Sequence, residues 1–209
     1  MKRTAAQKSL RDLRRTQIVA AARALVAQGG LDALTIGALE ERLGFSRGVI
    51  TYHFDDKDEI VEEVLRSAVD DIDADTTAQV ATAPTFDEKL RAVLRTKLHG
   101  FSANREAGRI LMTFWGRLWS DKRARSVNQE LLARYRDQSR SLIQAGQAAG
   151  AFARDADADA LGALLVGTVI GLATQQAVQE DAFDAEAALD EAARSFAARL
   201  SGPSRPHRA

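Results

Sequence analysis

Apolar positions along this chain recur at intervals of three and four residues, the spacing that places them on one face of an α-helix. Near the start, such a pattern runs through Ile18, Ala21, Ala22 and Leu25 and stops at Gly29. The alternation of apolar and polar positions that is typical of β-strands is missing, and only three prolines interrupt the 209 residues. The pattern therefore predicts an all-α protein.

Capping residues and glycines predict where these helices begin and end. Thr35 and Ser46 stand where N-caps belong, Gly44 ends the helix between them, and Asp56 followed by Glu59 resembles a capping box. The predicted helices cover approximately residues 10–28, 35–43, 46–54, 57–73, 86–102, 105–120, 124–149, 157–180 and 184–200.

This order of helices divides the chain into a small N-terminal module and a larger body. Residues 1–56 hold three helices and a basic leading arm, and the helix at 57–73 is expected to act as a connector. Residues 74–201 are expected to form the body, and residues 202–209 a flexible tail that contains two prolines.

Composition narrows the class of protein. Without cysteine the chain has neither a disulfide framework nor a thiolate metal site, and its three histidines lie far apart in the sequence. No Gly-x-Ser-x-Gly nucleophile turn occurs, and the acidic run DADADA has Ala160 where a calcium loop has glycine. We therefore expect no metal, no cofactor and no enzymatic activity.

The most apolar window, residues 160–173, is 14 residues long. A membrane-spanning helix needs about 20 residues, so this window is predicted to be a fully buried helix. No secretory signal follows the basic start. We expect a cytoplasmic protein that does not enter a membrane.

Charge is distributed unevenly although the formal net charge is zero. Residues 1–15 carry six basic groups and one acidic group. A basic arm on a neutral body favours a polyanion as partner, although the same arm would also suit a purely solubilising role.

Residues 33–59 have the length and turn chemistry of a helix-turn-helix, whose second helix lies in the major groove of DNA. Arg47 stands early in that helix, where a guanidinium can bind O6 and N7 of guanine, and Gly48 allows a close approach. Thr35 and Lys57 are placed to bind phosphates. A plain helical hairpin would show the same spacing, with its Tyr and His as ordinary core or surface residues.

The run LTIGALEERLGFSRGVITYHFDDKDEIVEEVL, residues 34–65, resembles the DNA-binding domain of the tetracycline-repressor (TetR) family. The shared features are a Thr-initiated helix, a Gly-hydrophobic-Ser turn, a short helix that ends in aromatics, and a Lys-acid pair. The body is similar in length and helix count, with a likeness to the choline-sensing, BetI-like branch. Gly37 and Thr51 depart from the family pattern, which has a polar residue and a Tyr at these positions in many members.

The resemblance implies a homodimeric transcriptional regulator, by default a repressor, that binds an inverted-repeat operator and is released by a small-molecule effector. It places base contacts and phosphate contacts on the second helix and its flanks. The predicted DNA-binding residues are Thr35, Ser46, Arg47, Gly48, Val49, Thr51, Tyr52, His53 and Lys57. The alternative is a helical ligand-binding or scaffold protein that does not use this module.

In this family the helices of the body enclose a ligand cavity, and both Trp residues of the chain lie in the window RILMTFWGRLWSD. An aromatic cluster at helical spacing is also typical of a protein core. The predicted ligand-binding residues are Phe101, Met112, Trp115, Trp119, Tyr135 and Gln175.

Small residues are concentrated in the ranges Leu161–Val178 and Ala187–Leu200, where Gly162, Gly167 and Gly171 share one helix. Small side chains allow helices to pack closely. We expect these two helices to form the homodimer interface, as a four-helix bundle across a two-fold axis. Packing within one chain is the alternative explanation for the glycines.

Overall fold

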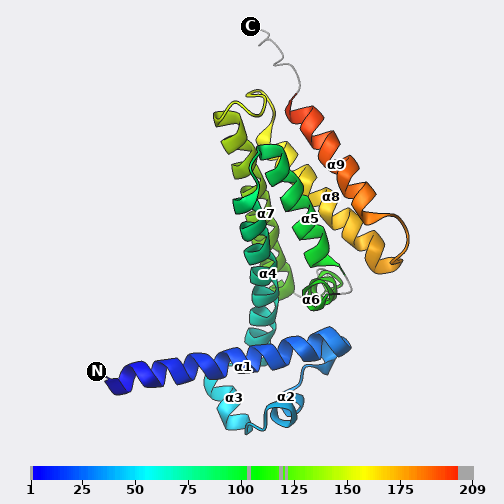
Figure 1. Cartoon of the computed structure of the whole chain (residues 1–209). Coiled ribbons are helices and arrows are strands. Elements are labelled where there is room, and N and C mark those ends of the chain that lie inside the picture. The colour runs from blue at the N-terminus through cyan, green and yellow to red at the C-terminus, as the bar shows by residue number, and fades with distance from the viewer. Residues whose placement is uncertain (1, 103–104, 118–119, 121, 202–209) are drawn as a thin grey trace. The chain divides into compact units, whose positions relative to one another are not determined.

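The computed structural model describes residues 2–102, 105–117, 120 and 122–201, with the backbone alone for residues 2–9. Over these residues the chain is helical and contains no β-strand, which confirms the all-α prediction. The helices are α1 (Lys2–Ala33), α2 (Ile36–Leu43), α3 (Arg47–His53), α4 (Lys57–Thr82), α5 (Phe86–Phe101), α6 (Glu106–Trp115), α7 (Lys122–Ala148), α8 (Ala158–Val178) and α9 (Ala185–Leu200) (Figure 1).

The chain forms two compact units. The N-terminal unit consists of Met1–Asp70 and Glu106–Asn128, and the C-terminal unit consists of Asp71–Arg105 and Gln129–Ala209. Helices α4 and α7 each contribute to both units. This division differs from the predicted body at 74–201, because α6 and the start of α7 group with the N-terminal helices.

Within the N-terminal unit, α1 packs against α2, α3 and α6. The side chains of Ile18, Leu39 and Ile50 are fully buried, so each of the first three helices contributes an apolar residue to the same core. An ion pair between Arg23 Nε and Glu106 Oε1, at 2.7 Å, joins α1 to α6. Sequence spacing alone could not show this pairing of distant segments.

The caps of the short helices follow the sequence closely. Thr35 Oγ1 accepts a hydrogen bond from the Ala38 N–H at 3.0 Å, which begins α2. Gly44 ends α2 with φ at 65°, a left-handed conformation that favours glycine. Ser46 occupies the N-cap position of α3, although its side chain makes no capping bond in the described structure. Gly30, with φ at 70°, produces a kink where the sequence predicted the end of α1.

Helix α4 is longer than predicted. The polar residues that follow Asp73 predict its end there, but the helix continues to Thr82. Ile72 and Thr76 are buried in this second half, and Thr96 Oγ1 of α5 donates a hydrogen bond to Thr76 Oγ1 at 3.0 Å. Burial of one face therefore stabilises a helix whose composition is mostly polar.

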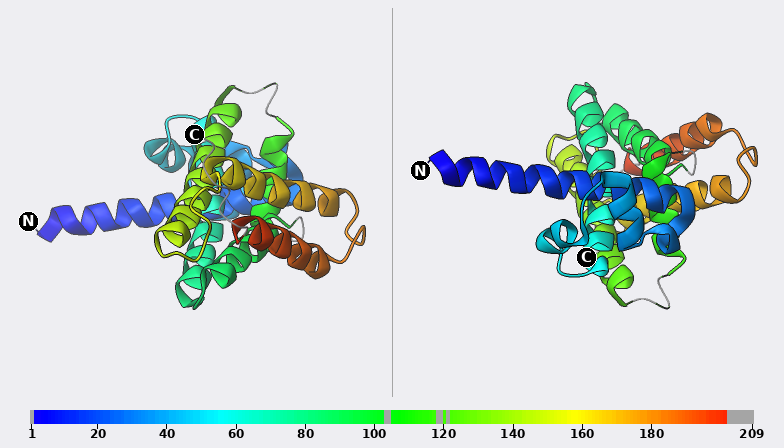
Figure 2. Two further views of the ribbon diagram at one scale, coloured as in Figure 1. Left: turned by 90° about the horizontal axis from the view of Figure 1, so that it is seen from above. Right: turned by 90° about the horizontal axis from the view of Figure 1, so that it is seen from below.

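In the C-terminal unit, α5 packs against both α8 and α9, which also contact each other (Figure 2). By length and composition alone α8 could cross a membrane, yet 33% of its most apolar window is buried within the chain. The prediction of a fully buried helix was wrong, because Leu164 is 60% exposed and Val178 is 85% exposed. Helix α8 therefore has an uncovered apolar face in the single chain.

The turn before α3 depends on the conformation of Gly44. We expect Gly44→Ala to lower the free energy of unfolding of the N-terminal unit by about 1–2 kcal/mol, the cost of a left-handed conformation for a residue with a Cβ. Gly37→Ala in the same helix is the control. No atom lies closer than 4.0 Å to its added Cβ, so it should raise stability by up to about 1 kcal/mol. Urea unfolding of both variants measures this, and equal effects would contradict it.

Candidate functional site

Helix α3 buries Ile50 and His53 and presents its other residues to solvent. Ile50 is fully buried, whereas Tyr52 is 69% exposed and Val49 is 37% exposed. The remaining predicted base-facing and turn residues are also exposed, namely Ser46, Arg47, Gly48 and Thr51. Most of the predicted set on α3 therefore lies on the accessible side of one short helix, with a single apolar anchor behind it.

Two arginines of α1, Arg14 and Arg15, contact residues at or next to the ends of α3. Arg15 donates a hydrogen bond to the His53 carbonyl at 2.8 Å and another to Glu59 Oε1 at 3.0 Å, and its guanidinium lies 4.1 Å from the centre of the Phe54 ring. Arg14 lies over the ring of Phe45 at 4.5 Å. These residues were counted only as part of a basic arm. Their partners lie far away in the sequence, so no local pattern reveals this role.

The His53 side chain is buried rather than presented to solvent. It is 8% exposed, and its buried Nδ1 has no hydrogen-bond partner in the described structure. Burial lowers the pKa of His53 below its usual value, and the nearby charges of Arg11, Arg15 and Arg14 lower it further. The predicted phosphate contact through this side chain stays untested, although a buried imidazole is poorly placed to reach a phosphate.

The two remaining predicted phosphate contacts flank α3. Thr35 is exposed at the N-terminus of α2, where its hydroxyl already caps the helix. Lys57 is exposed at the start of α4, and its Nζ donates to the Leu31 carbonyl at 3.3 Å. Both therefore lie at helix N-termini beside α3, with Lys57 held from the preceding segment.

Acidic residues around the start of α4 are paired with arginines, which offsets their negative charge. Arg123 Nη1 lies 3.4 Å from Asp56 Oδ1 and 3.5 Å from Asp58 Oδ2. Glu59 accepts from Arg15 and from the Asp55 N–H. These ion pairs reduce the repulsion that free carboxylates would exert on a polyanion near α3.

The C-terminal unit contains a cavity of about 340 Å³. Residues of α4, α5, α7 and α8 line it, so that four helices of one unit converge on it. This volume lies within the range of small-molecule pockets, roughly 300–1,000 Å³. Its walls are mainly apolar, with Val80, Leu142, Leu165, Val166 and Val169 among them.

Phe101 and Tyr135, two of the predicted ligand-binding residues, do line this cavity. Their rings meet edge to face, with centroids 5.8 Å apart and planes at 88°. Both are almost fully buried, at 2% and 3% exposure. The structure thus brings together two residues that lie 34 positions apart in the sequence.

The other predicted lining residues are placed elsewhere. Met112 and Trp115 belong to α6 in the N-terminal unit, where both are half-buried and their neighbours Leu111 and Phe114 are core residues. Gln175 is exposed on α8, where its side chain donates to the Gly171 carbonyl at 3.2 Å. None of these three residues lines the cavity. Trp119 lies outside the described residues.

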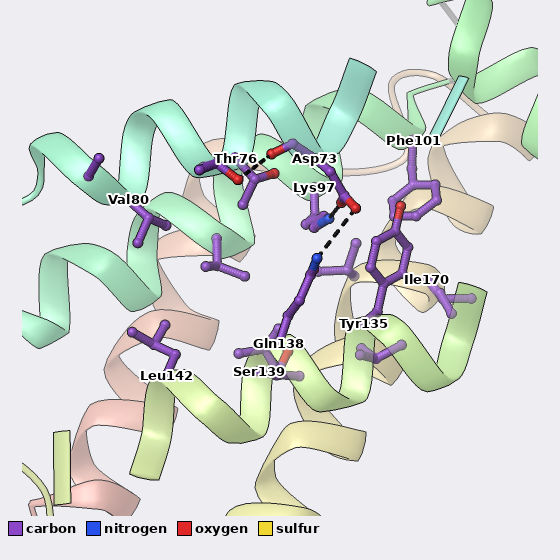
Figure 3. Close-up of a pocket in the computed structure, with 16 residues that line it drawn as sticks. Asp73, Thr76, Val80, Lys97, Phe101, Tyr135, Gln138, Ser139, Leu142 and Ile170 are labelled. Carbon is purple, nitrogen blue, oxygen red and sulfur yellow. Dashed lines mark hydrogen bonds and ion pairs between the residues drawn. The ribbon is translucent and has the colours of Figure 1, made fainter. Parts of the chain in front are cut away.

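The polar end of the cavity was missed from the sequence. Lys97 pairs with Asp73 Oδ1, and Gln138 Nε2 donates to Asp73 Oδ2 at 3.3 Å (Figure 3). Arg134 Nε also donates to Asp73 Oδ2, at 2.7 Å. Lys97 Nζ also lies 3.8 Å from the centre of the Tyr135 ring. Burial lowers the pKa of Lys97, and the hydrogen bond and charge of Asp73 oppose this effect.

One sequence pattern could have revealed Lys97. It falls on the same helical face as Leu90, Leu94 and Phe101, all of which are buried. A lysine on an apolar face is unusual, because a buried ammonium needs a partner to offset its lost hydration. The identity of that partner, Asp73, was not available from spacing.

The three glycines of α8 have different surroundings. A Cβ on Gly162 would lie 3.2 Å from the Arg136 carbonyl oxygen and 3.3 Å from the Arg140 nitrogen, so this glycine allows α8 to pack closely on α7. No atom lies within 4 Å of a Cβ added to Gly167 or Gly171. Packing within the chain therefore explains one glycine and leaves the other two on an open surface.

Among the side chains that the structure describes, no group of His, Asp and Glu could hold a metal ion. The polar groups that line the cavity are one carboxylate, Asp73, with its cationic and amide partners, and the hydroxyl groups of Thr76, Thr77, Tyr135 and Ser139. This arrangement suits recognition of a molecule by hydrogen bonds, charge and apolar contact.

Comparison with known proteins identifies the class. Residues 18–64 match the family model described as bacterial regulatory proteins, tetR family. Residues 86–202 match the model described as BetI-type transcriptional repressor, C-terminal. The chain therefore belongs to the tetR family of transcriptional regulators and has a C-terminal region of the BetI type.

Individual relatives agree with this assignment. The chain is 27% identical over 184 residues to the HTH-type transcriptional regulator BetI of Paraburkholderia phymatum, which covers 86% of this chain and 89% of that protein. A protein of Rhodococcus sp. assigned to the TetR family has a TM-score of 0.77 at 20% identity, over 90% of this chain and 98% of its own. The structure of a regulator of Saccharomonospora viridis in complex with choline has a TM-score of 0.73 at 24% identity, over 87% of this chain and 94% of its own.

The buried His53 predicts a pH dependence of stability. Its folded pKa lies below the unfolded value of about 6.5. Between these two values the unfolded chain binds more protons, so the free energy of unfolding should fall as the pH is lowered from 7 through this range, by at most about 1.4 kcal/mol per pH unit. Urea unfolding across pH 5 to 8 should give a flatter profile for His53→Gln. The exposed His99→Gln serves as control, and a profile for His53→Gln as steep as that of the original chain would refute the assignment.

Proposed function

We propose that this regulator binds an inverted-repeat operator as a homodimer, with one α3 in each half-site, and that a small molecule in the cavity releases it from DNA. The observation that carries the DNA part is the division of α3 into a buried anchor, Ile50, and an exposed face with Arg47 and Tyr52. The match to BetI-type repressors supports repression as the direction of control. Its place of action is then the cytoplasm, where the DNA is.

The exposed face of α3 supports specific roles in the major groove. Arg47 is placed to bind a guanine edge, and Gly48 leaves room for the helix to approach. The Thr51 hydroxyl donates to the Arg47 carbonyl at 3.0 Å, which leaves its methyl group for an apolar contact with a base such as the thymine methyl. Val49 offers a similar contact, and Tyr52 extends toward either a base or a phosphate.

Phosphate contacts from both flanks would hold this helix in register. Ser46 at the N-cap of α3 and Thr35 with the N-terminal N–H groups of α2 can bind one phosphate each. Lys57 supplies a positive charge on the opposite flank. The hydrogen bond that Arg15 donates to the His53 carbonyl would keep α3 in place, and Arg15 itself would not contact DNA.

The open face of α8 supports the homodimer through Leu161–Val178 and Ala187–Leu200. Leu164, Gly167, Gly171 and Val178 leave apolar or unobstructed surface on this helix. Covering such an apolar surface lowers the free energy of a chain in water, and small residues allow a second helix to come close. A symmetric contact would use the same face of both copies.

Continuous helices offer a route from the cavity to the DNA-binding residues. Helix α4 carries Lys57 near its start and the cavity residues Asp73 and Val80 in its second half. Helix α7 carries Arg123, which pairs with Asp56, and the cavity residue Tyr135. A small molecule that binds better to one arrangement of these helices shifts the population toward it, by no more than its differential affinity.

Mobility shifts with the DNA that flanks the gene of this protein test the DNA part. We expect Arg47→Ala and Tyr52→Ala each to weaken binding by at least about tenfold, because base-edge contacts are lost from both half-sites. Lys57→Ala should instead reduce the salt dependence of binding. Arg154→Ala is the control, because it also removes one positive charge, from an exposed position in the C-terminal unit. This variant should bind DNA as the original chain does.

A specific result would contradict this proposal. If the original chain shifts no DNA at low salt, or if Arg47→Ala and Arg154→Ala bind alike, then α3 does not read DNA. The chain would then fit the alternative of a helical ligand-binding protein whose DNA-binding module is unused.

Sedimentation velocity tests the dimer. Leu164→Glu places a charge on the exposed face of α8, twice in a symmetric interface, so we expect the dimer to weaken by about a hundredfold or more. Leu13→Glu, which alters a leucine with similar exposure on α1, should leave the dimer intact. A dimer unaffected by Leu164→Glu, or a monomeric original chain, would rule out this interface.

A further inference from the structure

We infer that the cavity takes an amphipathic anion, a small molecule with an apolar body and one carboxylate head group that binds Lys97. This inference rests on the proposed function only in treating the cavity as the effector site. It adds the chemical class of the effector, for which the residues of the cavity offer three separate arguments.

The first argument is the hydrogen-bonding capacity of Lys97. Its side chain is 7% exposed and its Nζ bonds to Asp73 Oδ1. An ammonium has three donors and no acceptor, and a single bond to Asp73 uses one of them. A ligand carboxylate is an acceptor with two oxygens, so it can take a further donor and add a second negative charge beside the buried cation.

The second argument is that Asp73 is already engaged by cations and an amide. One oxygen pairs with Lys97, and the other accepts from Arg134 at 2.7 Å and from Gln138 at 3.3 Å. A ligand with a positive head group would have to displace these donors to reach the carboxylate. It would also bring a like charge close to Lys97, which is unfavourable in a largely buried site.

The third argument is the occupied face of Tyr135. Quaternary ammonium groups are commonly recognised over the faces of aromatic rings. Here Lys97 Nζ lies 3.8 Å from the Tyr135 ring centre, while Phe101 meets that ring edge to face. The chain's own cation therefore takes a position that a choline-like head group would need. This sets the cavity apart from what the Saccharomonospora viridis structure, solved with choline, would suggest.

The rest of the cavity suits an apolar body. Figure 3 shows Asp73, Lys97 and Tyr135 toward one end and Val80 and Leu142 toward the other. Val166 and Val169 of α8 add further apolar wall. A molecule that crosses the cavity would thus meet a charged end and an aliphatic end, which is the polarity of an alkyl carboxylate.

A matched series of head groups tests the inference on the full chain. Isothermal titration calorimetry with octanoate, 1-octanol and octyltrimethylammonium keeps the apolar body constant while the charge changes. We expect octanoate to bind at least about tenfold more tightly than 1-octanol, because a charge-assisted bond is gained. Octyltrimethylammonium should bind more weakly than 1-octanol.

Variants assign the preference to Lys97. Lys97→Met keeps an apolar stem and removes the charge, so octanoate should lose its advantage while 1-octanol binds as before. Lys89→Met on the same helix does not line the cavity and should keep the preference. If Lys97→Met fails to fold, Asp73→Asn combined with Lys97→Met removes both members of the buried pair, and the Arg134 side chain that loses Asp73 is 44% exposed.

Three outcomes would overturn the inference. These are equal binding of octanoate and 1-octanol, tightest binding of octyltrimethylammonium, and binding by none of the three compounds. A preference for octanoate that survives in Lys97→Met would also contradict the role of Lys97. DNA binding is measured without any ligand, so a failure here is distinct from a failure of the proposed DNA binding.

Discussion

The anchoring of α3 is the constraint on which the DNA-binding surface depends. A helix of seven residues is too short to be stable alone in water. Ile50 buries one side of it, Gly44 sets the direction from which the chain enters, and Arg15 bonds to the carbonyl of its last residue. With these contacts in place, the exposed side chains of α3 are available for recognition rather than stability.

The cavity depends on a comparable balance between burial and pairing. Lys97 is tolerated inside the C-terminal unit because Asp73 offsets its lost hydration, and Asp73 is in turn bonded by Arg134 and Gln138. These residues come from α4, α5 and α7, so the ion pair also fixes how three helices meet. Under the proposed effector control, a ligand that competes for one member of this network would change the preferred packing of those helices.

Caps and apolar spacing within single segments made much of the fold predictable. The predictions that failed depended on contacts between segments that are distant in the sequence. Thr35, Gly44 and the apolar spacing of α5 are local signals, and the structure follows them. The extension of α4 beyond Asp73 depends on Thr76 packing against Thr96, which no local pattern records. The aromatic window around Trp115 was assigned to the cavity because the sequence does not reveal that α6 packs against α1. His53 is likewise buried by its neighbours in the fold, which its position in the sequence does not reveal.

The central claim is that two copies of α3 read DNA, and hydroxyl-radical footprinting on the DNA upstream of the gene tests it most directly. We expect two protected segments related by inverted symmetry, with centres about one helical turn, or a multiple of it, apart. Both segments should lose protection together in Arg47→Ala. A single protected segment without symmetry, or an unchanged pattern in this variant, would contradict the account.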